Sequence, residues 1–313
     1  MSSVDISQYA VGAESIDILS QRQIETFFWE QKLVTKDECD RLARSITKSS
    51  VSPRLVQNWK AYTVATDADA QQPKAIQFQQ AQQTYGDFVP GCTFYGKLED
   101  VYVYEMSRVP GIAFCRIRRQ LLASGMEKCM VRTVRDFARF FASAWIKRPV
   151  LQQLPAIDEL FNDYCQTLDR LAQSLPTRFQ SKLDEVRQGL HLLFRPSYPM
   201  VANHTGLLEM NIYVDEQIGG ITGIVGWAAS EIAPFGTSLG GLETVLGVQT
   251  SSCWHFHPLH NTLRAQFWEE FYGDIGHVSD EDRRAIEIAR MFGLFQTHGF
   301  EEHELETQII TDA

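Results

Sequence analysis

Residues 200–231 read MVANHTGLLEMNIYVDEQIGGITGIVGWAASE. Two short apolar runs, residues 211–214 and 221–225, flank a Gly-Gly step that favours a turn. Strand-forming runs on both sides of turn residues predict a β-hairpin. A segment that contains His204 precedes the first predicted strand, and a Gly-Trp step follows the second. The stretch therefore predicts a polar loop next to a buried hairpin.

This order of residues resembles the catalytic core of the aminoglycoside phosphotransferase and choline-kinase-like family, above all its divergent members in filamentous fungi. The family pattern is H-G-D-x-x-x-x-N, then a hairpin, then I-V-D-W. His204 and Asn211 match the pattern, whereas Gly206 stands where the catalytic Asp is expected and Gly226 where the metal-binding Asp is expected. The resemblance covers residues 59–300. It implies an α+β, two-lobed protein-kinase-like fold, with a small β-rich lobe and a larger helical lobe.

The two glycines matter because phosphoryl transfer needs a group that orients the attacking hydroxyl, and carboxylate-held magnesium beside the phosphates. Glycine supplies neither. Loss of a general base alone typically lowers the rate by about 10²–10⁴-fold. The remaining Asn211 offers one neutral oxygen, which makes a poor magnesium site. The departures from the family pattern indicate a pseudokinase, or a pocket repurposed for non-phosphoryl acid–base chemistry on a small metabolite.

Two other functions stay open. A non-catalytic binding or scaffold protein would hold a protein partner through the lobes or through the N-terminal helices. An active small-molecule kinase would need displaced catalytic groups, and the nearest aspartates, Asp87 and Asp215, fall outside the matching frame. A small-molecule ligand is expected for either enzymatic function. The resemblance points to secondary metabolism or general fungal metabolism and names no substrate.

Two residues of the loop are candidate catalytic groups. In the family the matching residue of His204 fixes the loop by hydrogen bonds, whereas a general base would need an exposed ring and a partner carboxylate. Glu209 is a candidate replacement acid or base, and its alternative role is that of a carboxylate that braces the loop. For both residues we expect the structural role over the catalytic one.

The resemblance also implies positions on the nucleotide side of the cleft. Gln77, on a predicted strand over residues 75–78, stands where the family carries its phosphate-binding lysine. Glu105 and Met106 fall in the hinge, whose backbone pairs with adenine in active relatives. Asn211 completes this group of candidate cofactor-binding residues.

Three further residues are candidates for a substrate pocket. Glu231 lies close in sequence to the lost metal position, and His255 and His257 are two residues apart in a predicted loop over residues 254–258. Two histidines without a third ligand are a weak metal signal. The six cysteines are scattered and form no C-x-x-C pair, so we expect reduced cysteines, no metal site and no bound cofactor.

Composition limits the partners. The chain has 313 residues and a formal net charge of −10, and 44% of its residues are hydrophobic. An acidic surface argues against binding to nucleic acids or to anionic membranes. No apolar run approaches the roughly 20 residues of a membrane span, and the first residues lack the features of a signal peptide. We expect a cytoplasmic protein.

The chain divides into three predicted parts: an N-terminal arm with helices over residues 1–50, a small lobe over 51–106, and a helical lobe over 107–313. Residues 1–19 are expected to be a loose or partner-dependent arm, residues 79–85 to be too short for a full helix, and the acidic tail beyond 300 to be mobile. Apolar residues at helical spacing predict further helices. They cover residues 21–46 in two pieces, 131–146, 157–175, 179–194, 261–272, and a last one capped by Ser279.

Overall fold

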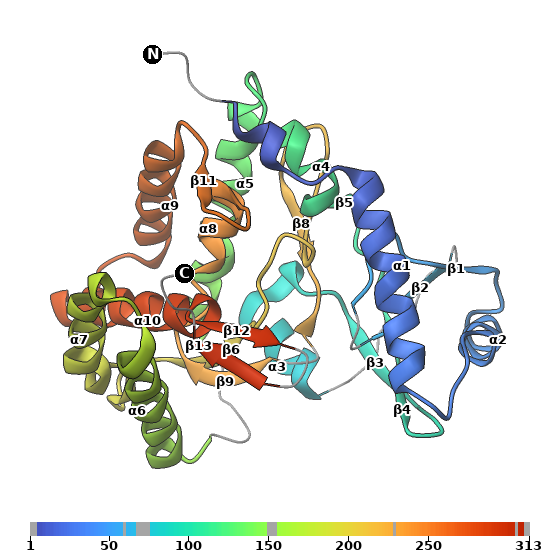
Figure 1. Cartoon of the computed structure of the whole chain (residues 1–313), viewed down its shortest axis with the longest axis horizontal. Coiled ribbons are helices and arrows are strands. Elements are labelled where there is room, and N and C mark those ends of the chain that lie inside the picture. Colours follow the sequence, from blue (N-terminus) through green and yellow to red (C-terminus); the bar gives the residue numbers. More distant parts are fainter. Residues whose placement is uncertain are drawn as a thin grey trace.

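The computed structural model describes residues 5–58, 61–66, 76–148, 155–227, 230–303 and 306–309. Figure 1 shows the first four strands and α2 on one side of the molecule, and α6, α7, α9 and α10 on the other, with α1 running along the strand-containing side. The α+β class, with a small strand-containing part and a larger helical part, is confirmed.

The N-terminal segment is helical and docked. Its elements are η1 (Ile6–Tyr9), α1 (Ala13–Glu30) and α2 (Lys36–Thr47). The two predicted helices are confirmed, and a capping box between Thr35 and Glu38 starts α2. The expectation of a loose arm is wrong for residues 6–19, because Ile6 and Ala10 are buried in the main core.

The strand-containing part consists of two antiparallel pairs. They are β1 (Val51–Pro53) with β2 (Val64–Thr66), and β3 (Cys92–Leu98) with β4 (Val101–Met106). The strand predicted over residues 75–78 is wrong, and residues 79–85 are not too short for a helix. These residues form α3 (Ile76–Tyr85), followed by η2 (Gly86–Phe88). Ala81 and Tyr85, four residues apart on one helix face, are fully buried, and this packing selects the helix.

Helices make up most of the remaining chain. They are α4 (Phe114–Leu121), α5 (Glu127–Lys147), α6 (Ile157–Ser174), η3 (Thr177–Phe179), α7 (Gln180–Gly189), η4 (Leu190–Phe194), α8 (Gly241–Leu246), α9 (His260–Ile275) and α10 (Asp280–His298). The predicted helices are confirmed, except that the one over residues 179–194 is divided into shorter helices. Ser279 caps α10, since its hydroxyl accepts from the backbone N–H of Asp282.

Five short strands lie within residues 200–231 or pair with strands of that stretch. They are β5 (Ile112–Ala113), β7 (Ile212–Val214) and β8 (Ile221–Ile224) in one sheet, and β6 (Met200–Asn203) paired with β9 (Glu231–Pro234). The predicted hairpin β7–β8 is confirmed. Its turn needs glycine at position 219, where φ is 73° and a Cβ would lie 2.5 Å from the carbonyl oxygen of Cys129. The turn is therefore pressed against α5.

Two further hairpins differ from expectation. They are β10 (Gly247–Gln249) with β11 (Trp254–Phe256), and β12 (Phe300–His303) with β13 (Glu306–Ile309). The loop predicted over residues 254–258 is wrong for its first three residues, because these pair with β10. The expectation of a mobile tail is wrong for the two strands after α10, whose backbones pair with each other.

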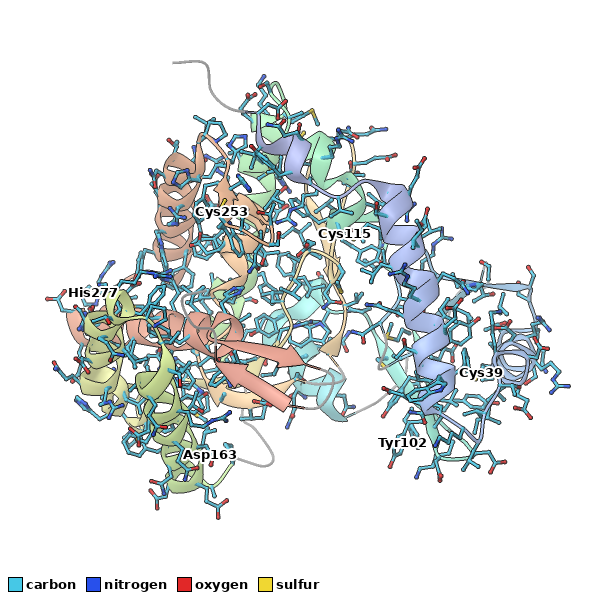
Figure 2. All side chains as sticks on the ribbon, viewed as in Figure 1. Cys39, Tyr102, Cys115, Asp163, Cys253 and His277 are labelled. Atoms are coloured by element: carbon cyan, nitrogen blue, oxygen red, sulfur yellow. The ribbon has the colours of Figure 1, made fainter. Side chains whose placement is uncertain are left out.

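The main core joins the helical part to the quoted stretch. Tyr85 stacks on Phe140 of α5 with ring centroids 4.1 Å apart, and it lies 5.0 Å from Trp227. The hydroxyl of Tyr85 donates to the carbonyl oxygen of Ala202, 2.7 Å away. Side chains fill the space between the ribbons (Figure 2). Among the described helices, none combines the length and apolar character that a bilayer crossing requires.

Candidate functional site

The segment between β6 and β7, residues 204–211, is the predicted catalytic loop. Strand pairing fixes both of its ends, since β6 pairs with β9 and β7 lies in the middle of its sheet. Inside the loop the backbone N–H of Asn211 donates to the carbonyl oxygen of Leu208, 2.9 Å away, and its carbonyl accepts from the N–H of Val225 at the same distance. The loop is therefore tied to the segment that follows β8.

His204 is buried, with 4% of its surface exposed. Its Nε2 lies 2.7 Å from the carbonyl oxygen of Val225, and its Nδ1 lies 3.1 Å from the backbone nitrogen of Gly206, which donates to it. This pattern requires a neutral ring protonated at Nε2. Burial lowers the pKa of His204 to about 4. Because both ring nitrogens are engaged with backbone groups, the geometry favours the structural role.

Glu209 forms an ion pair with Arg118 of α4. Its Oε1 accepts from Nη1 of Arg118 at 2.8 Å. The buried guanidinium also donates to the carbonyl oxygens of Thr244, at 2.9 Å, and of Gly247. Desolvation lowers the pKa of Arg118, and the Glu209 carboxylate opposes this effect. The arrangement braces the loop against α4 and α8, as expected for a structural carboxylate.

Gly206 and Gly226 both lie next to the side chain of Asn211. Nδ2 of Asn211 donates to the carbonyl oxygen of Gly206 at 2.7 Å. A Cβ at Gly226 would lie 2.9 Å from Oδ1 of Asn211, and a Cβ at Gly206 would lie 4.0 Å from its Nδ2. The positions of the two expected aspartates thus border the same amide. The backbone of Gly226 has φ of 90°, which disfavours any side chain there.

The expected nucleotide-side residues lie on two elements. Glu105 and Met106 end β4, where Met106 pairs with Cys92 of β3 and packs against the main core. Gln77 belongs to the first turn of α3 instead of a strand, so the strand frame that placed it at the lysine position is lost; its side chain lies outside the described residues. Asn211 faces the glycines described above.

A polar cavity of about 180 Å³ lies against the loop. Of the three predicted pocket residues, Glu231 lines it. The other polar residues that line the cavity were not predicted from the sequence, because they come from segments that only the fold brings together. They are Asn203, Thr205, Thr237, Ser238, Thr244, Gln296, Thr297 and His298. Burial lowers the pKa of His298.

The two predicted pocket histidines lie elsewhere. His255, on β11, stacks on Tyr9 with ring centroids 3.7 Å apart, and its Nε2 lies 3.4 Å from Sγ of Cys253. His257 is buried before α9, where its Nδ1 accepts from the backbone N–H of Leu259 at 3.1 Å. The fold therefore separates both rings from Glu231, because β11 directs one toward η1 and the start of α9 buries the other.

Metal and cofactor binding have few candidate ligands. In the part of the chain that the structure describes, no three His, Cys, Asp or Glu side chains are grouped as a metal site. The amide oxygen of Asn211 is a neutral ligand of the type that magnesium accepts only as one member of a larger set. The loop offers an anchored backbone and no carboxylate directed at Asn211, since Glu209 is paired with Arg118.

Comparison with known proteins gives fold similarity alone. No family model and no curated protein matches the chain. The chain is similar to the solved structure of a macrolide 2'-phosphotransferase type I, with 12% identity, 84% of this chain and 91% of that chain covered, and a TM-score of 0.48. It is also similar to aminoglycoside phosphotransferase APH(3'')-Id from Streptomyces rimosus, solved with ADP and streptomycin, with 16% identity, 80% and 96% covered, and a TM-score of 0.45.

Proposed function

We propose that this chain is an aminoglycoside-phosphotransferase-like protein that does not carry out ordinary magnesium-dependent phosphoryl transfer. One observation supports this most directly: Gly206 and Gly226 border the same Asn211 amide. The loop keeps the frame in which a base and a metal would act together, but both positions lack a side chain. A reaction that needs a proton acceptor and bound magnesium therefore has neither at this place.

The side-chain amide of Asn211 is already engaged within the loop. Its Nδ2 donates to Gly206, and its Oδ1 faces the backbone of Gly226. His204, the other residue that matches the family pattern, is neutral and engaged at both nitrogens. These contacts tie the loop to its surroundings and engage its two titratable side chains, since Glu209 is bound to Arg118. The loop then serves as a scaffold for the surrounding surfaces.

The test is a calorimetric titration of the purified protein with ATP, with and without Mg²⁺. We expect magnesium to leave ATP binding unchanged. The matched variants are Gly206→Asp, which adds the expected base, and the double variant Gly206→Asp/Gly226→Asp. Gly273→Asp is the control, because it adds a carboxylate at a remote glycine of α9 where a Cβ meets nothing within 4 Å.

Two results would contradict the proposal. ATP affinity that rises tenfold or more with Mg²⁺ in the unmodified protein would reveal a displaced carboxylate site. Equal Mg²⁺ binding, titrated without nucleotide, in the unmodified protein and in a folded double Asp variant would show that these glycines do not occupy the base and metal positions. Circular dichroism separates this second result from misfolding, which the strained backbone at Gly226 makes a concern.

A second candidate function is the binding of a small polar molecule in the cavity beside Thr205. Hydroxyl, amide, imidazole and carboxylate groups line this cavity, and a few convergent polar groups in a concave site are typical of ligand binding. A metabolite screen by thermal shift tests it, with Glu231→Gln as the pocket variant and the exposed Glu269→Gln as the control. We expect a ligand whose stabilisation is lost only in Glu231→Gln; a screen without any such ligand would count against this function.

A further inference from the structure

A small hydrophobic cluster separate from the main core adjoins the candidate site. Its buried members are Val109, Ala113, Cys115 and Tyr213. Met210 and Val225, the chain neighbours of Asn211 and Gly226, pack against it. The cluster therefore lies next to the segments that carry Asn211 and Gly226.

The elements that supply this cluster connect the predicted hinge to the loop. Val109 follows β4 in the hinge segment, and Ala113 of β5 pairs with Tyr213 of β7. The backbone N–H of Cys115 donates to the carbonyl oxygen of Glu209, 3.0 Å away. The cluster thus draws its members from the predicted hinge segment and from the segments next to Asn211.

The N-terminal segment covers the same face. Ile16 of α1 and Val56, which follows β1, both pack against the cluster. The guanidinium of Arg54 lies 4.8 Å from the ring centre of Tyr213, over its face. As a result Tyr213 is only 6% exposed. The cover thus combines apolar contact with a cation–π contact.

Hydrogen bonds join the two pieces of the cover to each other. The hydroxyl of Ser20 donates to the carbonyl oxygen of Leu55 at 3.0 Å and accepts from the backbone N–H of Gln57 at 3.3 Å. An ion pair between Asp17 and Arg116 attaches α1 to α4. Figure 1 shows the first part of α1 near α4, which agrees with this ion pair. Residues 54–57 and α1 therefore form one unit on the face of the cluster.

We propose that α1 and residues 54–57 form an intramolecular cover that closes the face between the hinge and Asn211 and excludes adenine nucleotides from it. This cover rests on the proposed function and deepens it. The proposed function explains the absence of phosphoryl transfer by the two missing carboxylates, and the cover adds a steric reason. The cover is part of the chain, so its displacement would be required before any ligand could contact Tyr213.

Cys115 is a natural reporter of the cover. It is labelled in Figure 2, lies in the cluster, and its burial raises the pKa of its thiol to about 12. Cys92 is the internal control, because it is buried in the main core and its pKa is likewise raised to about 12 by burial. Alkylation by N-ethylmaleimide, followed by peptide mass spectrometry, measures the opening of both places in one sample.

The variants are Ile16→Ser and Val56→Ser, each of which removes one apolar contact of the cover. Ile18→Ser is the matched control, since Ile18 lies on the same helix and is 58% exposed. We expect alkylation of Cys115 to accelerate at least tenfold in the first two variants, with Cys92 unchanged, and neither rate to change in Ile18→Ser. If one variant unfolds, both cysteines accelerate together and the other variant decides.

Unchanged alkylation of Cys115 in folded Ile16→Ser and Val56→Ser would overturn the cover. ADP without magnesium provides the second measurement: we expect it to leave Cys115 alkylation of the unmodified protein unchanged, and slower alkylation would show a nucleotide on the face and also overturn the cover. Neither result depends on Mg²⁺. Failure of the cover is therefore distinguishable from failure of the proposed function, which the magnesium titration measures.

Discussion

The surroundings of Gly206 and of Gly226 differ although both lack an expected carboxylate. At Gly206 the nearest atom to a Cβ would be Nδ2 of Asn211, 4.0 Å away. At Gly226 the same side chain would come within 2.9 Å, and φ is 90°. The first position could accept a side chain as it stands, whereas the second could accept one only after Asn211 and the backbone had moved.

Under the proposed function, this difference decides which of the two expected carboxylates one substitution could supply. A missing base can be restored by one substitution on an unstrained backbone. A missing metal ligand at Gly226 cannot, because a positive φ favours glycine and the space next to it is filled. At Gly226 both the backbone conformation and the packing against Asn211 oppose a side chain. At Gly206 neither the backbone nor the packing opposes one.

The largest effect we expect concerns His204, which links the two regions. Burial lowers the pKa of His204 from about 6.5, the ordinary value for histidine, to about 4 in the folded chain. A lowered pKa means that the unfolded chain binds more protons between these values, so stability falls as pH falls from 6.5 toward 4. Between pH 7 and pH 5 the loss from this residue should be about 2 kcal/mol.

The measurement for His204 is urea unfolding of the unmodified protein and of His204→Gln at both pH values. His257 and His298 also have lowered pKa values, but they are present in both proteins, and their contribution cancels in the difference. Equal pH dependence in the two proteins would show that the ring is accessible to protons in the folded state.

The next effect concerns Gly226 itself. Gly226→Ala places a Cβ on a backbone with φ of 90° and against Asn211, so it should lower the free energy of unfolding by about 1–2 kcal/mol. Thermal unfolding followed by circular dichroism measures it. An unchanged midpoint would mean that the loop adjusts freely, and the contrast between the two glycines would disappear.

A smaller effect separates packing from backbone strain at Gly226. In an Asn211→Ala background the close contact between the new Cβ at position 226 and the Asn211 side chain is absent, while the strained φ at position 226 remains. The cost of Gly226→Ala should therefore be smaller there by about 1 kcal/mol, within the range of coupling energies between contacting residues. A double-mutant cycle measured by urea unfolding tests this, and strictly additive costs would assign the whole effect to the backbone.

The smallest effect concerns Gly206. Gly206→Ala meets open space apart from Asn211 at 4.0 Å, so the free energy of unfolding should change by less than about 0.5 kcal/mol. The same thermal unfolding experiment measures it beside Gly226→Ala. A loss as large as that of Gly226→Ala would place both glycines under the same constraint.

Local patterns in the sequence were sufficient for much of the fold. The hairpin β7–β8 follows from two apolar runs around a Gly-Gly step, and α5, α6, α9 and α10 follow from apolar residues at helical spacing. The cap of the last helix at Ser279 was likewise predicted from neighbouring residues, and the hydroxyl of Ser279 accepts from the backbone N–H of Asp282. These signals are strong because they depend on neighbours along the chain.

Contacts between distant residues decided the rest. Residues 76–78 form part of α3 instead of the predicted strand, because Ala81 and Tyr85 of this helix are buried in the core. η1 packs against the main core because Ile6 and Ala10 are buried in it. The sequence by itself determined that glycine stands at positions 206 and 226, where the family resemblance places aspartates. Only the tertiary structure decided that Asn211 lies between them, that the cavity unites Glu231 with His298, and that α1 covers Tyr213. The physical reason is that burial and close approach arise between segments far apart in sequence, which no local pattern records.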